Sequence, residues 1–287
     1  PHKGYEDLTP DEIIEIVREA GIVGMGGAGF PTAVKLKPNK PIEAVLLNGC
    51  ECEPLLTADH RVLLEFADDI IYGLKAVLKT VDAQKGIIVI EDNKPDAIAL
   101  MEEKLADCDN IEVVTAKTKY PQGAERQLIY ATTKRAIHAA MLPADAGCVV
   151  DNIDTVCAVY RAVMKGEPVM DRIVTVTGDA VAEPGNFKVR LGTSFAELLE
   201  EAGGLKTPAK KIISGGPMMG FAMFDYHVPV VKTSSALLCM SEDEVSENEP
   251  TACINCGRCV SACPARLVPS RLATYSEHGR EDLFVKY

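Results

Sequence analysis

The sequence predicts an α/β fold in three parts: a Rossmann-like domain with a parallel sheet, a small β-grasp domain and a C-terminal ferredoxin-like segment. Three observations predict this fold. Buried strands alternate with helices over the first half of the chain, short alternating strands follow from Arg172, and four cysteines lie within eleven residues near the C-terminus. We expect the three parts to span residues 1–165, 166–245 and 246–287.

The composition excludes several classes of protein. The 287 residues carry a formal net charge of −12, whereas a nucleic-acid surface needs basic residues that neutralise phosphates. No run reaches the roughly 20 apolar residues of a membrane span. Ten cysteines without secretory features indicate metal or redox chemistry and not a disulfide framework. The chain starts at Pro1 without a methionine, and we expect domains to be missing on that side.

A glycine-rich stretch, residues 24–35, is the first candidate site. A capping box at Thr9 and Glu12 predicts a helix that Gly21 ends, and the stretch follows directly. Its glycines leave backbone N–H groups uncovered and allow positive φ, which close approach to a phosphate or a flat ring requires, and Lys35 supplies a charge. A flexible loop is the alternative, because many glycine clusters are only turns. The glycines are Gly24, Gly26, Gly27 and Gly29.

Polar side chains follow the first predicted strand, residues 43–48. In open α/β sheets ligands bind at the carboxyl ends of the strands, so these side chains form a second candidate site. A solvated acidic loop is the alternative. Cys50 and Cys52 in this loop are either a redox pair or small packing residues, and we favour packing. The polar side chains concerned are Asn48, Glu51 and Glu53.

The next elements repeat the βαβ pattern. We expect a long helix over residues 57–79, a strand over 86–91, a helix capped by Asn93 that runs to residue 105, and a strand over 111–114. Such units imply right-handed crossovers and a mostly parallel sheet.

Two more polar loops open at the same predicted edge of the sheet. The loop at residues 120–125 contains Gly123 and Glu125 and precedes a helix over 126–139. Asp151 is the expected cap of a further helix, with Asn152 as a ligand contact. Each loop alone is compatible with an ordinary turn. Four of them at corresponding ends of one sheet indicate a shared binding site.

The second part alternates strands with one short helix. Ser194 and Glu197 form a capping box for this helix, which Gly203 ends. A second glycine turn, residues 215–220, is interpreted as a tight structural turn; the alternative is that it faces a cofactor. The expected strands are residues 173–177, 187–191, 211–213 and a segment around 228–231.

The cysteine run has the spacing C-x₂-C-x₂-C-x₃-C-P. Closely spaced thiolates of this kind wrap an iron–sulfur cubane, whereas zinc motifs pair two distant C-x₂-C elements. We therefore favour a 4Fe–4S cluster over zinc. The ligands would be Cys253, Cys256, Cys259 and Cys263.

The same spacing has a consequence for cluster content. In two-cluster ferredoxin modules the fourth cysteine of one run ligates the other cluster, and no cysteine follows Cys263. Either all four thiolates hold one cluster or the chain is truncated, and we expect truncation. The chain as given is then predicted to hold little or no intact cluster. Iron and acid-labile sulfide analysis giving about four of each per chain would contradict this.

Together the motifs resemble a known family. The segments at residues 24–32, 48–54, 120–125 and 215–220, with the cysteine run, resemble RnfC, the peripheral subunit of the Rnf electron transport complex. More distantly, the first two segments are similar to the NADH-binding flavoprotein subunit of respiratory complex I. The resemblance implies a flavin domain followed by a β-grasp domain of the soluble-ligand-binding type.

The resemblance also implies roles for individual residues. FMN would lie between the glycine-rich stretch and the acidic loop, and Lys35 would approach its phosphate. NADH would lie against the flavin, with Phe30 stacked on the adenine and Glu53 at the ribose hydroxyls. Cys50 and Ala124 depart from the complex I pattern, in which acidic residues are usual. The glycines Gly24, Gly26, Gly27 and Gly29 would line FMN, and the further flavin contacts would be Asn48, Glu51, Gly123, Glu125 and Asn152.

The implied function is that of an electron-input subunit. Hydride would pass from NADH to FMN, and electrons would leave through 4Fe–4S clusters, two in the full-length protein, or flow in reverse. The partners would be membrane-embedded and other peripheral subunits of an ion-translocating complex at the cytoplasmic face of the cell membrane. This would make the chain part of an NADH:acceptor oxidoreductase, incomplete in this fragment and without a catalytic proton-transfer residue. The alternatives are a cobalamin-reductase-type flavoprotein and a non-catalytic docking module.

Overall fold

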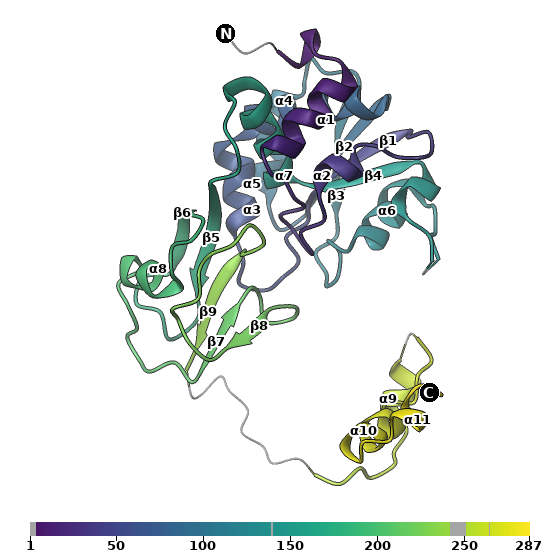
Figure 1. Ribbon diagram of the computed structural model, residues 1–287, viewed down its shortest axis with the longest axis vertical. Coiled ribbons are helices and arrows are strands. Elements are labelled where there is room, and N and C mark those ends of the chain that lie inside the picture. The colour runs from purple at the N-terminus through teal and green to yellow at the C-terminus, as the bar shows by residue number, and fades with distance from the viewer. Residues whose placement is uncertain (1–3, 139, 242–250, 264) are drawn as a thin grey trace. The chain divides into compact units, whose positions relative to one another are not determined.

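The computed structural model describes residues 4–138, 140–241, 251–263 and 265–287. The chain divides into two compact units, Pro1–Val245 and Ser246–Tyr287, each of which is described by itself (Figure 1). The expected boundary between residues 245 and 246 lies outside the described residues. The same holds for Ala139, the expected end of a helix, and for Pro264 of the cysteine motif.

Four parallel strands form the first sheet, in the order β3-β2-β1-β4. This confirms the predicted parallel sheet, but β4 was not among the predicted strands. Its pairing with β1 places Asn48 directly beside Asn152 at the carboxyl edge. The strands are β1 Ala44–Gly49, β2 Lys85–Glu91, β3 Ile111–Ala116 and β4 Cys148–Asn152.

Helices cover both faces of this sheet (Figure 1). Successive side chains of a strand point to opposite faces, so Val45 and Leu47 of β1 join one apolar cluster while Leu46 joins another. The first cluster packs against α1, α4 and α7, and the second against α6. The helical elements are η1 Tyr5–Asp7, α1 Pro10–Glu19, α2 Thr32–Lys35, α3 Ala58–Glu65, α4 Ala67–Val81, α5 Pro95–Lys104, α6 Glu125–Thr133, η2 Pro143–Ala146, α7 Ile153–Tyr160 and a π-helical turn η3 Arg161–Lys165.

Three predicted helices differ in the structure. The long helix is two helices, because Phe66 leaves the helical region at φ −126° and ψ 31°. Asn93 does not cap α5; Lys94 is the N-cap, since Pro95 occupies the first helical position. The helix expected to begin at residue 126 is shorter and ends at Thr133, because Lys134 is left-handed with φ 61°.

The second sheet has five strands in the order β6-β5-β9-β7-β8, with the helix α8 Phe195–Glu201 packed on it. The capping box of Ser194 and Glu197 is confirmed. The strand expected around residues 228–231 is wrong: this segment makes only an isolated bridge between Pro229 and Ser194. Proline has no N–H to donate to a ladder, and the strand is β9 instead. The strands are β5 Asp171–Thr177, β6 Gly185–Arg190, β7 Lys211–Ser214, β8 Phe221–Met223 and β9 Ala236–Met240.

The described part of the C-terminal unit contains short helices, and these helices have no buried residue. The rings of Tyr275 and Tyr287 lie 5.7 Å apart, and the Arg271 guanidinium lies 5.6 Å from the Tyr287 ring centroid. Within the part of the chain that the structure describes, no helix is both long and apolar enough to cross a membrane. The helices are α9 Arg258–Ala262, α10 Pro269–Glu277 and α11 Glu281–Phe284.

Candidate functional site

Hydrogen bonds join the four predicted loops at the carboxyl edge of the first sheet. The Asn48 side chain, at the end of β1, donates to the Gly123 carbonyl at 2.8 Å. The Met25 amide of the glycine-rich stretch donates to Thr155 Oγ1 in α7 at 3.0 Å. Gly26 lies against Asn152, which ends β4. The loops that the sequence analysis grouped by topology therefore meet in space.

The glycine-rich stretch needs glycine at particular positions. The Gly24 amide donates to the Phe30 carbonyl at 2.8 Å and closes the loop. Gly29 has φ +72°, in the left-handed region that favours glycine. A Cβ on Gly26 would lie 2.8 Å from Asn152 Nδ2, whereas one on Gly27 would meet no atom within 4 Å. Gly26 thus allows close packing on Asn152, and Gly27 borders open space.

Lys35 is paired inside the protein. Its Nζ donates to the Val150 carbonyl at 2.7 Å and lies 3.0 Å from Asp151 Oδ1. Burial raises the pKa of the Asp151 carboxyl, and Lys35 opposes that rise. The predicted phosphate-binding charge is therefore present but shared with a buried carboxylate. Asp151 lies on β4 and does not cap the following helix; Asn152 does, by accepting a hydrogen bond from the Asp154 amide at 2.9 Å.

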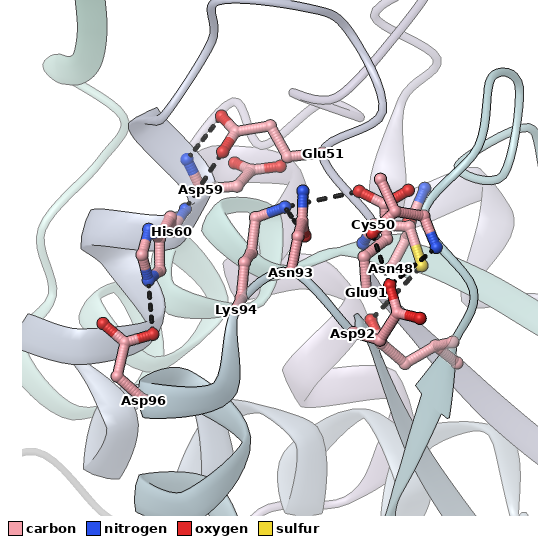
Figure 2. A network of polar contacts seen from close by, with 12 residues as sticks. Asn48, Cys50, Glu51, Asp59, His60, Glu91, Asp92, Asn93, Lys94 and Asp96 are labelled. Atoms are coloured by element: carbon pink, nitrogen blue, oxygen red, sulfur yellow. Dashed lines mark hydrogen bonds and ion pairs between the residues drawn. The ribbon is translucent and has the colours of Figure 1, made fainter.

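Glu51 binds the start of α3. Its two carboxylate oxygens accept hydrogen bonds from the amides of Asp59 and His60 at 2.9 and 3.2 Å (Figure 2). These N–H groups have no partner within a helix, so the carboxylate satisfies them and faces the positive end of the helix dipole. Burial raises the pKa of Glu51, and the two amide hydrogen bonds oppose the rise. The predicted flavin contact is thus held in one orientation by α3.

Asp59 joins this group of carboxylates, and the sequence analysis missed it. Its Oδ2 accepts a hydrogen bond from the Asn152 side chain at 2.8 Å. Burial, together with the nearby carboxylates of Glu51 and Asp154, raises the pKa of Asp59 to about 8. Asp59 lies in a segment predicted only as scaffold helix, and no local pattern signals that β4 will approach it.

A buried ion pair lies beside the acidic loop (Figure 2). Lys94 Nζ is 3.3 Å from Glu91 Oε2, and these side chains are 7% and 1% exposed. Cys50 is also buried, and burial raises the pKa of its thiol to about 12. A thiol with such a pKa stays protonated and inert at neutral pH, which is what the packing interpretation expects. Cys50 and Cys52 are both free cysteines.

The remaining predicted contacts fall into two groups. Gly123 is enclosed, because a Cβ there would lie 2.3 Å from the Cys50 carbonyl oxygen. Glu125 begins α6, and burial raises the pKa of its carboxyl. By contrast, Phe30 is 52% exposed and available to a ligand. Glu53 Oε2 accepts a hydrogen bond from the Met218 amide at 3.1 Å. The second glycine turn therefore contacts a predicted nucleotide residue.

Arg172 of β5 connects the site to the second sheet. Its Nη1 donates to the Met25 carbonyl at 3.2 Å, and also to the Lys232 carbonyl. Its Nε lies 3.0 Å from Asp154 Oδ2 in α7. In the sequence, Arg172 only marks where the pattern of elements changes. A long-range contact of this kind has no local signal.

The cysteine run has donors suited to an iron–sulfur cluster. Cys253, Cys256 and Cys259 are exposed, Cys263 is half-buried, and all four are free. The Asn255 amide lies 3.4 Å from Cys253 Sγ, as an N–H directed at sulfur would. Among the described residues, no three or more metal-ligating side chains are gathered closely enough to hold a metal ion. The prediction of an iron–sulfur cluster in this segment thus rests on its four cysteine donors and their spacing.

Comparisons with known proteins identify families and relatives that the chain resembles. Residues 17–161 match the family described as the Nuo51 FMN-binding domain, and residues 173–222 match the SLBB domain. The chain is 44% identical, over 98% of its length, to a subunit of the proton-translocating ferredoxin:NAD(+) oxidoreductase complex of Clostridium ljungdahlii. It is 43% identical, again over 98% of its length, to the corresponding subunit of the Na(+)-translocating ferredoxin:NAD(+) oxidoreductase complex of Acetobacterium woodii. The predicted resemblance to RnfC is confirmed.

A solved structure supports the fold. A chain of the NAD+-reducing NiFe hydrogenase in the H2-reduced state superposes with a TM-score of 0.72 at 21% sequence identity. The match covers 84% of this chain and 48% of the hydrogenase chain. The same hydrogenase in the air-oxidized state gives a TM-score of 0.71.

The fraction of each protein that is matched determines which family the chain can be assigned to. This chain spans 61% of the length of the Clostridium ljungdahlii relative and 64% of the Acetobacterium woodii relative. The FMN-binding match covers just over half of the 287 residues and includes the whole first sheet. The chain therefore belongs to the Nuo51 FMN-binding domain family.

Proposed function

We propose that this chain is the electron-input part of a ferredoxin:NAD+ oxidoreductase complex of the RnfC type. It accepts hydride from NADH on a bound FMN and passes electrons to iron–sulfur clusters, or carries them in the reverse direction. The observation that carries the proposal is the meeting of four loops at the carboxyl edge of the parallel sheet. Open α/β sheets bind their ligands at this edge.

The shape of the glycine-rich stretch supports a flat ligand at this edge. Gly26 and Gly123 occupy positions where any side chain would collide with Asn152 or with the Cys50 carbonyl. Gly27 borders open space, so its backbone can be approached from outside. The hydroxyl of Thr32 is buried and has no hydrogen-bond partner in the described part of the chain. A cradle of glycine backbone with an unused polar group fits a cofactor better than it fits an ordinary turn.

The residues that would hold FMN form two groups, the glycine-rich stretch with Lys35 and a set of mostly polar residues. The glycine backbones Gly24, Gly26, Gly27 and Gly29 line one wall, and Lys35 contributes a positive charge near the phosphate. Further contacts would come from Asn48, Glu51, Gly123, Glu125 and Asn152, and Asn152, which packs on Gly26, lies where the two sets of residues meet. When bound, FMN supplies the ability to accept a hydride and release electrons singly, which no side chain here supplies.

The chain's own residues bind and orient the nucleotide. Phe30 presents an exposed ring on which an adenine stacks, and Glu53 presents a carboxylate to the ribose hydroxyls. The carboxyls of Glu51 and Glu125 would lie close to the flavin, where their charge would tune its potential. Replacement of both by glutamine that left the flavin midpoint unchanged would contradict this tuning.

The cysteine run completes the proposal. The thiolates of Cys253, Cys256, Cys259 and Cys263 would ligate 4Fe–4S clusters that receive the electrons. The proposed parts are residues 1–165 for FMN and NADH, 166–245 for the β-grasp domain and 246–287 for the cluster segment. The proposed partners are the other subunits of the complex, membrane-embedded ones included, at the cytoplasmic face of the cell membrane.

One experiment tests the proposal directly. Purified protein is titrated with FMN under anaerobic conditions, and NADH is then added while the flavin absorbance is followed. We expect binding and then bleaching of the flavin band. Gly26→Val should weaken FMN binding at least about tenfold, whereas Gly185→Ala on β6 should not, because a Cβ there meets only ordinary contacts at 3.5 Å. A colourless protein without flavin affinity would favour the docking module.

A further inference from the structure

The turn between β7 and β8 contacts the acidic loop of the first domain. This turn, residues 215–220, lies between Lys211–Ser214 and Phe221–Met223, which pair as an antiparallel hairpin. The Met218 amide donates to Glu53 Oε2 at 3.1 Å. A Cβ on Gly216 would lie 2.0 Å from the same oxygen and 2.6 Å from Glu53 Cδ. The carboxylate is therefore packed directly on the turn.

The turn is fixed within its own domain. The Gly220 amide donates to the Gly216 carbonyl at 2.9 Å, and the Gly215 amide donates to the Ala236 carbonyl of β9 at 2.7 Å. A Cβ on Gly220 would lie 2.5 Å from the Gly216 carbonyl oxygen, so the turn closes only around glycine. The N–H that binds Glu53 is thus held on the second sheet.

A second contact holds the chain just after Glu53, at Thr57. The Thr57 amide donates to Thr175 Oγ1 of β5 at 3.2 Å, and Thr57 Oγ1 lies within hydrogen-bond distance of the Asn186 side chain. The segment from Glu53 to Thr57 is therefore attached at both ends to the second sheet. Its position depends on that sheet as much as on β1.

One oxygen of Glu53 is left for a ligand. Oε1 is buried and has no hydrogen-bond partner in the ranges that the structure describes. A buried carboxylate oxygen without a donor is unfavourable, so a site of this kind favours a ligand that brings a hydroxyl group. A vicinal diol such as that of a ribose fits this requirement, and a 2′-phosphate would meet the carboxylate with like charge.

We infer that the turn at residues 215–220 is a positioning element: it fixes Glu53 Oε2 so that Oε1 accepts a hydrogen bond from the ribose of NADH. The second domain thereby sets the preference for NADH over NADPH. This inference rests on the proposed function, because it assigns a determinant of the same nucleotide site.

The test adds one carbon to the turn. Gly216 lies outside the left-handed region, so alanine is compatible with its backbone and only the Glu53 contact is disturbed. We expect Gly216→Ala to weaken NADH binding about tenfold or more, to reduce the preference for NADH over NADPH, and to change the FMN dissociation constant less than twofold. Met219→Ala, which removes a neighbouring side chain that is 73% exposed and leaves the Met218 amide in place, should leave all three unchanged. Gly185→Ala is the matched glycine control.

A double variant separates positioning from general damage. Glu53→Ala removes the two atoms closest to the added carbon, so Gly216→Ala/Glu53→Ala has room to fold even if the single variant does not. The double variant should bind NADH as Glu53→Ala does. A further loss in the double variant, or equal weakening of FMN and NADH in Gly216→Ala, would overturn the inference.

Different results would overturn the inference and the proposed function. Wild-type protein that binds FMN and NADH while Gly216→Ala binds NADH equally well overturns the inference alone. Wild-type protein that binds neither compound overturns the proposed function and the inference with it.

Discussion

At the scale of single residues, Phe30 and Glu53 are the two residues that we propose to bind the nucleotide and not the flavin. Phe30 lies in the glycine-rich stretch and is 52% exposed, and its backbone carbonyl closes the loop. Its side chain is therefore free to contact a ligand, while its main chain shapes the loop. Removing the ring leaves the loop hydrogen bond in place.

Phe30→Ala tests the stacking role. Loss of an aromatic stacking contact should weaken NADH binding about five- to tenfold, which corresponds to about 1–1.5 kcal/mol, and change FMN binding less than twofold. Dissociation constants measured for both compounds check this. Phe224→Ala removes a ring that is 98% exposed on the second domain and serves as the control. Equal losses for FMN and NADH would show that the assignment of Phe30 is wrong.

Asp59→Asn tests the buried carboxylates by pH. Burial and the neighbouring carboxylates raise the pKa of Asp59 to about 8 in the folded protein, whereas a free aspartate has a pKa of about 3.9. The folded state therefore holds the proton more tightly, and its stability falls as pH rises from about 4 through 8. The variant should lack this fall, gaining on the order of 1–3 kcal/mol over wild type at pH 8.5 relative to pH 5.5.

Urea unfolding at these two pH values measures the difference. The amide oxygen that Asp59→Asn introduces can still accept the hydrogen bond that Asn152 donates to Oδ2, so the contact is retained. Asp68→Asn, in an exposed pair with Lys104, should change stability by less than about 1 kcal/mol at either pH. A wild-type minus variant difference that is the same at pH 5.5 and 8.5 would contradict the raised pKa of Asp59.

Sequence patterns predicted the site residues that stand out by type within a short segment. They did not predict residues whose role depends on contacts with distant parts of the chain. The glycines and the polar residues after β1 are visible because their types and spacing are unusual in a short segment. Asp59 and Arg172 are ordinary charged residues in a helix and a strand. Their roles come from contacts with Asn152 and Asp154, about 93 and 18 positions away along the chain, which only the folded topology creates.

At the scale of elements, helix capping boxes were predicted correctly, whereas the effects of two prolines on neighbouring elements were overlooked. The capping boxes of α1 and α8 depend on residues three apart and are confirmed. Pro95 signals that the residue before it caps α5, which the prediction of Asn93 overlooked. Pro229 argues against the strand predicted around it. The break at Phe66 has no glycine or proline signal in the sequence; in the structure the Arg161 guanidinium lies 5.6 Å from the Phe66 ring centroid.

The junction of β2 and α5 depends on one buried ion pair. Lys94→Met should leave the Glu91 carboxylate charged and without its cation at a site 1% exposed. Breaking one side of a buried pair destabilises proteins by about 3–5 kcal/mol. Urea unfolding at pH 7 should therefore show a loss of this order.

Two further variants test whether that loss comes from the unpaired Glu91 charge. Lys94→Met/Glu91→Gln removes both charges and should recover much of the loss. Lys104→Met breaks an exposed pair with Asp68 and should change the free energy of unfolding by less than about 1 kcal/mol. A Lys94→Met protein within about 1 kcal/mol of wild type would show that the pair does not stabilise this junction.

At the scale of the whole first unit, the two sheets share the site. The acidic loop is attached to the second sheet through Glu53 and Thr57. The glycine-rich stretch is attached through Arg172, whose side chain is 3% exposed. Both walls of the proposed flavin cradle therefore depend on a domain that lies later in the chain. Neither connection could be predicted from the sequence, because each joins segments that carry no complementary pattern.

Arg172→Met tests whether this shared arrangement stabilises the cradle. The variant leaves the buried Asp154 carboxylate without the Arg172 guanidinium and the Met25 carbonyl without its donor, and should lose about 3–5 kcal/mol of unfolding free energy. Hydrogen exchange should quicken at the Gly24 and Met25 amides, which are hydrogen-bonded in the wild type, because their loop loses its anchor. Arg190→Met, on the exposed face of neighbouring β6, should change neither quantity. Unchanged exchange at these amides despite lost stability would mean that Arg172 stabilises the sheets without shaping the cradle.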